Sequence, residues 1–181
     1  YSRAVAPGVP LTVIYDAGSS LLKWGQQLIG LDTPPLIASV SYGNDEAQQT
    51  STEYMYTSNT AFMKAGAKGL SILFASGDQG VCGRSGCGLF KKRFKPDFPG
   101  GSPYITVVGG TDFVTDSIGD ETAWTQSGGG FSDTFNSPDY PAKRVAAYTS
   151  APTAPATRAR LPPLRADVAG VVLLRRQASP L

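Results

Sequence analysis

The sequence contains no histidine, and this absence excludes several kinds of chemistry. Its 181 residues include no histidine and two cysteines, Cys82 and Cys87. A Ser-His-Asp triad therefore cannot be assembled from these residues. A structural zinc site is also disfavoured, because one cysteine pair cannot supply four ligands. The two cysteines bracket four residues, a spacing that is compatible either with a small disulfide loop or with two free thiols.

Long apolar runs are missing as well. No stretch reaches the roughly eighteen apolar residues that a membrane span requires, so the sequence predicts no transmembrane segment. The first residues, Tyr1 to Pro7, include neither an initiating methionine nor the apolar centre of a signal peptide. We therefore expect a fragment or a processed piece of a longer protein.

The end of the chain lacks aromatic residues and differs in charge from the rest. Residues 151–181 contain no aromatic side chain and carry five Arg against one Asp, whereas residues 1–150 carry 11 basic against 13 acidic residues. Because the basic excess belongs to the tail, the body shows no charge pattern for binding nucleic acid. We expect a globular part over 1–150 and an Arg/Pro/Ala-rich tail over 151–181 without stable order. Either a shifted reading frame or natural divergence would explain this tail.

What the sequence does contain is an alternation of strand and helix patterns. Apolar runs predict short strands at 11–15, 36–40, 70–75 and 105–108. Two amphipathic patterns predict helices between the first three strands, one capped by Ser19 or Ser20 and ending at Gly30, the other capped by Asn44 or Asp45 and ending near Lys68. Such alternation implies an α/β fold with a parallel sheet and right-handed crossovers.

The second helix and the segments after the last strand give further expectations. The predicted inward stripe of the helix consists of Ala47, Tyr54, Ser58, Ala61, Phe62 and Ala65. Downstream, we expect a turn at Gly109-Gly110, a loop over 127–132 and a short helix over 141–148.

The strand at 70–75 ends in Ser76-Gly77-Asp78, which is the most informative triplet of the chain. It places a carboxylate at the carboxyl end of a predicted parallel strand, where α/β proteins bind their ligands. Taken alone, such a triplet is also typical of a turn or of a helix cap. The functional interpretation therefore depends on the segments that accompany it.

Those segments are Ile37 to Gly43, Phe94 to Thr111 and Thr125 to Ser132. In their order and spacing they resemble the sedolisin family, serine-carboxyl peptidases with a subtilisin-like fold that includes the lysosomal tripeptidyl peptidases. The resemblance covers about residues 1–150. It implies an α/β architecture with a subtilisin-like parallel sheet and flanking helices, here incomplete.

The resemblance also assigns roles to residues. It implies that Asp78 completes the oxyanion hole. A carboxyl group can donate a hydrogen bond there only when it is protonated. Burial near other carboxylates and an acidic medium both favour the protonated form. It implies that two strand ends and one glycine-rich loop line the cleft of a peptide or protein substrate. These segments are Ser41-Tyr42-Gly43, Ser76-Gly77 and Ser127-Gly128-Gly129.

Two parts of the family pattern are missing from the sequence. The nucleophile motif Gly-Thr-Ser does not occur, since Gly110-Thr111 is followed by Asp112, and no Glu and Asp four residues apart precede the matched region. We therefore expect the chain alone to be inactive, because losing such linked groups removes nearly all activity. We expect no cofactor within these residues, and the family's calcium site would lie beyond residue 181.

Two other functional classes remain open at this point. One is a non-catalytic peptide-binding or structural remnant of the same fold. The other is an unrelated α/β binding domain such as a flavodoxin-like module, although no glycine-rich loop follows the first strand at phosphate-binding spacing. The family resemblance suggests a secreted protein or one of a lysosomal or other acidic compartment.

Overall fold

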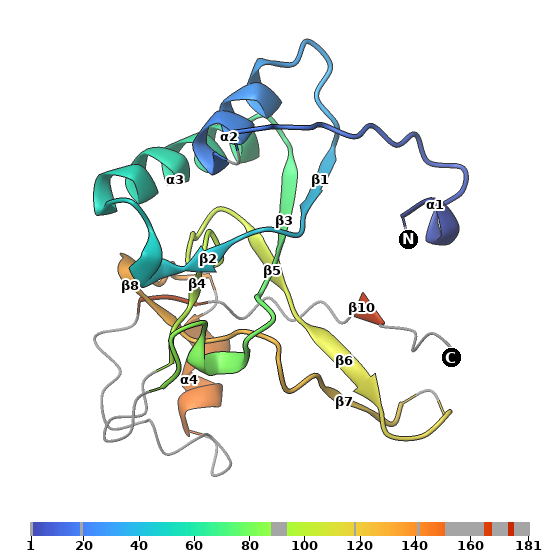
Figure 1. Cartoon of the computed structure of the whole chain (residues 1–181), viewed down its shortest axis with the longest axis vertical. Helices are drawn as coiled ribbons and strands as arrows, with labels where there is room; N and C mark the ends of the chain where they lie inside the picture. Colours follow the sequence, from blue (N-terminus) through green and yellow to red (C-terminus); the bar gives the residue numbers. More distant parts are fainter. Residues whose placement is uncertain are drawn as a thin grey trace.

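A three-stranded parallel sheet forms the centre of the fold in the computed structural model of the chain (Figure 1), which describes residues 2–18, 20–87, 94–117, 119–140, 142–150, 165–167 and 174–175. Its strands are β1 (Ile37–Val40), β3 (Ser71–Ala75) and β5 (Thr106–Val108), in the order β1-β3-β5. Ala38 lies opposite Ile72, and Phe74 lies opposite Val107. The predicted parallel arrangement is confirmed.

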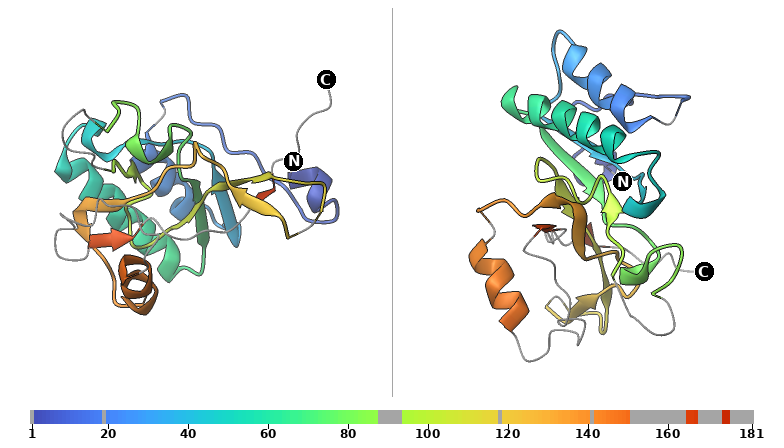
Figure 2. Two further views of the ribbon diagram at one scale, coloured as in Figure 1. Left: turned by 90° about the horizontal axis from the view of Figure 1, so that it is seen from below. Right: turned by 90° about the vertical axis from the view of Figure 1, so that its left-hand side faces the viewer.

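Two helices cover one face of this sheet and lie side by side, as the two views of Figure 2 show. They are α2 (Leu21–Gly30) and α3 (Thr52–Ala67). Helix α2 begins after Ser20, whose side chain accepts a hydrogen bond from the backbone N–H of Lys23 at 3.3 Å, as the capping pattern predicts. Within the described residues, no helix is long and apolar enough to cross a membrane.

The core lies between these helices and the sheet. Phe62 and Ala65 of α3 are fully buried, and the ring of Phe62 packs against that of Phe74 with centroids 5.8 Å apart. Leu28 of α2 is equally buried, and Trp24 meets Phe74 edge-on. The predicted inward face of α3 is thus confirmed at Ser58, Ala61, Phe62 and Ala65, while Ala47 is exposed and lies outside the helix.

Two predictions about the elements are wrong: one strand is absent, and one helix begins later than expected. Residues 11–15 form no strand, because no described strand pairs with them and only Ile14 packs against the core. The helix predicted from Asn44 or Asp45 begins later, since those two residues form β2 (Asn44–Asp45), followed by the 3₁₀ turn η1 (Glu46–Gln48). Ser51 caps α3 instead, accepting from the N–H of Tyr54 at 3.0 Å.

Outside the central sheet the strands are short. Strand β2 pairs antiparallel with β4 (Asp97–Phe98), and the turn η2 (Gly80–Cys82) follows β3. The chain leaves β5 through Gly109 into β6 (Gly110–Phe113), which pairs antiparallel with β7 (Glu121–Ala123) and projects away from the sheet in Figure 1. Gly110 therefore opens a strand rather than closing a turn.

The last described elements follow the glycine-rich segment. The predicted loop ends at Gly130, because Phe131 and Ser132 belong to β8 (Phe131–Asn136). The predicted short helix is present as α4 (Ala142–Ser150), and a short helix α1 (Ser2–Val5) lies near the amino terminus. In the tail, β9 (Arg165–Asp167) pairs with β8, and β10 (Leu174–Arg175) pairs with β6. The remainder of the predicted tail lies outside the described residues, so its lack of order stays a prediction.

A buried carboxylate joins η1 to β8. The hydroxyl of Ser132 and that of Thr134 each donate a hydrogen bond of 2.6 Å to the carboxylate of Glu46, and the backbone N–H of Asp133 donates a third of 3.0 Å. Glu46 is 6% exposed and Ser132 is fully buried. This network fixes the start of β8, and with it the end of the glycine-rich segment, against the region that precedes α3.

Replacing Phe62 with Ala should lower the free energy of unfolding by about 3–5 kcal/mol, because the ring fills the space between α3 and the sheet and leaves a cavity when removed. Its neighbour Met63 is exposed, so Met63→Ala should cost less than about 0.5 kcal/mol. Urea denaturation followed by circular dichroism measures both. Equal losses for the two variants would contradict the packing of α3 described above.

Replacing Glu46 with Ala should destabilise the chain by about 2–4 kcal/mol, because three donors would lose their acceptor and one of them, the hydroxyl of Ser132, is fully buried. Glu53, an exposed carboxylate on α3, is the matched control, and Glu53→Ala should cost about 0.5 kcal/mol. The same denaturation experiment applies. A Glu46 variant as stable as the Glu53 variant would show that the network contributes nothing.

Candidate functional site

The candidate site lies at the carboxyl end of the central sheet, where three chain segments far apart in sequence come together. The turn after β3 is attached to its neighbours by backbone hydrogen bonds. The N–H of Ser76 donates to the carbonyl of Val108 at 2.9 Å, and the N–H of Gly128 donates to the carbonyl of Gly77 at 3.3 Å. The predicted segments Ser76–Asp78 and Ser127–Gly129 therefore lie in direct contact.

The contact between these two segments requires glycine at one position. A side chain at Gly128 would collide with the carbonyl oxygen of Ser76. Ser127 links the glycine-rich segment to the start of β6, since its hydroxyl oxygen accepts a hydrogen bond from the N–H of Gly110 at 2.8 Å. Ser76 is buried, with 5% of its surface exposed. The serines of this region thus fix the backbone where β3 and β5 end.

The third predicted segment, Ser41-Tyr42-Gly43, follows β1 at the same end of the sheet. Ser41 and Tyr42 are exposed, Tyr42 to 55%, so the segment has surface that a ligand can reach. A β-carbon built on Gly43 would lie 3.1 Å from Oδ2 of Asp97, and one on Gly77 would lie at the same distance from the same atom. The ends of β1 and β3 therefore both abut one carboxyl group.

Asp78 is placed differently from what its predicted role requires. Its side chain is exposed, whereas the oxyanion role was expected to involve burial. It directly follows Gly77 at the edge of the candidate site, and its negative charge raises the pKa of Asp97. The oxyanion role of Asp78 stays a prediction.

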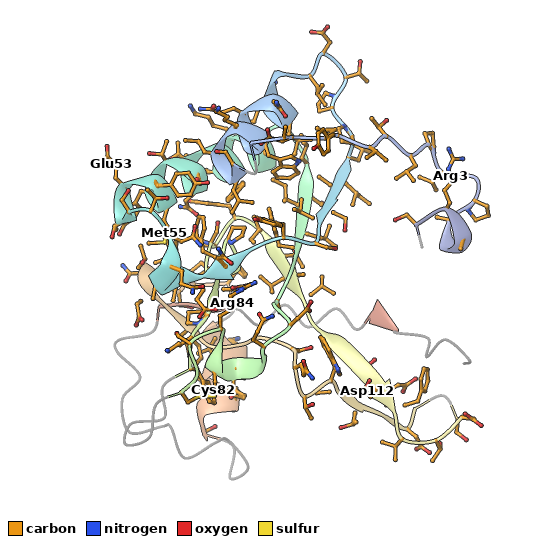
Figure 3. All side chains as sticks on the ribbon, viewed as in Figure 1. Arg3, Glu53, Met55, Cys82, Arg84 and Asp112 are labelled. Atoms are coloured by element: carbon orange, nitrogen blue, oxygen red, sulfur yellow. A yellow bond between two sulfur atoms is a disulfide. The ribbon has the colours of Figure 1, made fainter. Side chains whose placement is uncertain are left out.

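A cluster that the sequence analysis did not single out lies directly beneath these segments. Arg84 donates from its backbone N–H to Asp45 at 2.9 Å and from its guanidinium to Asp97 at 3.0 Å and to the carbonyl of Gly43 at 3.0 Å. Figure 3 labels Arg84 and Cys82 on the segment that follows β3. Cys82 and Cys87 form a disulfide that closes the short loop carrying Arg84, which decides between the two alternatives for this pair.

Within this cluster the pKa of Asp97 is raised. Burial raises the pKa of its carboxyl from 3.8 to about 6; the positive charge and hydrogen bond of Arg84 lower it, and the negative charges of Asp45 and Asp78 raise it further. A carboxyl of this kind changes its charge in weakly acidic solution rather than near pH 4. No group of three His, Cys, Asp or Glu side chains that could hold a metal ion occurs among the described residues.

Comparisons with known proteins identify the family and the fold. No protein-family model matches the chain. Tripeptidyl-peptidase 1 of Bos taurus is 42% identical over 143 residues, covering 75% of this chain and 24% of that protein. The human tripeptidyl-peptidase 1 is 40% identical over 143 residues, with the same coverage. The chain thus spans about a quarter of the length of the curated relatives it matches.

A solved structure supports the fold. It is that of a Pseudomonas sedolisin, a serine-carboxyl proteinase in complex with two molecules of pseudo-iodotyrostatin, and it matches with a TM-score of 0.57. The match covers 71% of this chain and 38% of the sedolisin chain at 24% identity, so it bears on architecture alone. Over the part that matches its relatives, the chain belongs to the sedolisin family of serine-carboxyl peptidases and has a subtilisin-like α/β fold.

Proposed function

We propose that this chain is the part of an acid-acting serine-type peptidase that forms one wall of the peptide-binding cleft. The observation that carries the proposal is the meeting of three separate segments at the carboxyl end of the sheet. Ser76–Asp78 contacts Ser127–Gly129, and both Gly43 and Gly77 abut Asp97. Binding sites of α/β folds lie at this end of the strands.

The exposed backbone after β1 suits an extended peptide. Ser41 and Tyr42 are exposed beyond the last paired residue of β1, and peptides commonly bind by adding a strand to such an edge. In this proposal Ser41, Tyr42 and Gly43 line one side of the substrate, and Ser127, Gly128 and Gly129 line the other. Asp78 at the rim serves as the hydrogen-bond donor to the oxyanion when protonated, in a lysosomal or other acidic compartment.

A second candidate function has its own support in the sequence. The residues contain neither the Gly-Thr-Ser nucleophile motif nor the paired Glu and Asp of the family. A chain with the cleft wall but without nucleophile and base can still bind a peptide without cleaving it. The non-catalytic peptide-binding remnant therefore differs from the peptidase part only in whether the longer protein supplies the missing groups.

Residues 1–181 alone should bind peptides without hydrolysing them. We expect no release of product from a fluorogenic oligopeptide at pH 3–6. Addition of an uncleaved oligopeptide to the isotopically labelled chain should instead shift the amide resonances of Ser41–Gly43 and Ser127–Gly129. Nuclear magnetic resonance titration measures the binding, and fluorescence measures the turnover.

A pair of glycine variants provides the control. Gly128→Ala should abolish the peptide-induced shifts, because its β-carbon would displace the Ser76 turn, whereas Gly66→Ala on α3 has open space and should leave them intact. Turnover that survives repurification and disappears on Asp78→Ala, but not on Asp139→Ala, would overturn the expected inactivity. Peptide shifts confined to regions outside the three segments would overturn the cleft assignment.

A further inference from the structure

The pairing of β2 with β4 brings two carboxylates together. Asp45 lies directly opposite Asp97 in this antiparallel pair, and their side chains are only 2% and 7% exposed. Like charges at opposed positions repel, and burial removes the water that would screen them. The arrangement therefore depends on a positive group placed between the two strands.

Arg84 is that group, and its loop is shaped to reach both carboxylates. One guanidinium nitrogen, Nη1, lies 3.4 Å from Oδ1 of Asp45 and 3.0 Å from Oδ1 of Asp97. Both oxygens of Asp45 also accept from the backbone N–H of Arg84. Gly83 makes this approach possible, because it has a φ of +59° and a β-carbon there would lie 2.7 Å from both oxygens of Asp45.

The other oxygen of Asp97 faces the cleft segments. Oδ2 fills the space beside both Gly43 and Gly77, within 3.1 Å of the position that a β-carbon on either would take. Arg84 adds a second link to the same place, since its Nη2 donates to the carbonyl of Gly43 at 3.0 Å. The carboxyl of Asp97 is therefore the point at which the end of β1, the turn after β3 and the disulfide loop meet.

We propose that Asp45, Asp97 and Arg84 form a protonation-dependent clamp, in which the charge on Asp97 determines how firmly the end of β1 is held against the Ser76–Asp78 turn. When Asp97 is ionised, the charge-assisted bond to Arg84 ties the disulfide loop, β4 and Gly43 together. When Asp97 is protonated, Arg84 remains bound to Asp45 and loses its ionic partner on β4. The spacing between Gly43 and Gly77 then changes with pH.

The burial of Asp97 makes this change occur in weak acid, and its charged neighbours modify the effect. It is faced by Arg84 from the disulfide loop, by Asp45 from β2 and by Asp78 from the turn after β3. Because its pKa is raised by burial from 3.8 to about 6, the folded state binds the proton more tightly than the unfolded state does. The Asp97 contribution to stability is therefore full below pH 3.8 and is lost as the pH rises through about 6.

Titration of the whole chain by nuclear magnetic resonance tests the clamp. We expect the carboxyl carbon of Asp97 and the amides of Gly43 and Gly77 to shift together with one midpoint near pH 6. Asp97→Asn should remove that midpoint from both glycines, and Asp139→Asn, which removes an exposed carboxylate, should leave it unchanged. Arg84→Gln should move the midpoint upward, because the opposing positive charge is gone.

Thermal unfolding gives an independent measurement. Between pH 4 and pH 7 the melting temperature of the unaltered chain should fall relative to that of Asp97→Asn, since only the former acquires a buried charge. Glycine amides that do not follow Asp97, or that titrate unchanged in Asp97→Asn, would overturn the proposal, as would a midpoint of Asp97 near 4. If Arg84→Gln does not fold, the titrations of the unaltered chain and of Asp97→Asn still test the proposal. None of these measurements involves catalysis or a peptide, so their outcome is separate from that of the proposed function.

Discussion

The central position of β3 is the constraint on which the rest of the structure depends. This strand pairs with β1 on one side and β5 on the other, and its Phe74 packs against both Trp24 and Phe62. Because all three strands run in the same direction, the chain leaves each of them at the same end of the sheet. The candidate site is therefore a consequence of parallel pairing and would not exist in an antiparallel arrangement of the same strands.

Three buried carboxylates around this end are stabilised in three different ways. Glu46 accepts hydrogen bonds from neutral groups, namely two hydroxyls and one backbone N–H. Asp45 accepts from the backbone N–H of Arg84 as well as from its side chain. Asp97 depends on the guanidinium alone among the hydrogen bonds described for it. Burial raises the pKa of Asp97 even so, because the cost of burying its charge outweighs the stabilising contact with Arg84.

The sequence was sufficient to predict the elements whose pattern is local. The strand at 70–75, the helix capped by Ser20 and the inward face with Phe62 follow from apolar spacing and capping residues, and the structure confirms them. The run at 11–15 has the same local pattern but forms no strand, because pairing depends on a neighbour that the pattern does not reveal. The start of α3 was misplaced for a related reason, since Asp45 pairs with a strand more than fifty residues away.

The sequence likewise predicted only some residues of the candidate site. The segments at Gly43, Gly77 and Gly128 could be predicted because family-like motifs mark them, and the structure places them together. Arg84 could not be predicted as a site residue, because it lies in an irregular loop without a periodic pattern. Its long side chain reaches Asp97 from this loop, which the disulfide closes. Asp97 lies within the family-like segment from Phe94 to Thr111, but only its burial opposite Asp45 distinguishes it from a surface carboxylate.

The close approach of backbone at Gly43, Gly77 and Gly128 has a consequence for how related sequences are interpreted. At each position a β-carbon would press against a carboxylate or a carbonyl within the fold itself, before any ligand is present. Selection for folding alone would thus retain these glycines in a lineage that had lost enzymatic activity. Their retention in a newly sequenced gene would be evidence of an intact scaffold, and evidence of an active enzyme would have to come from other positions.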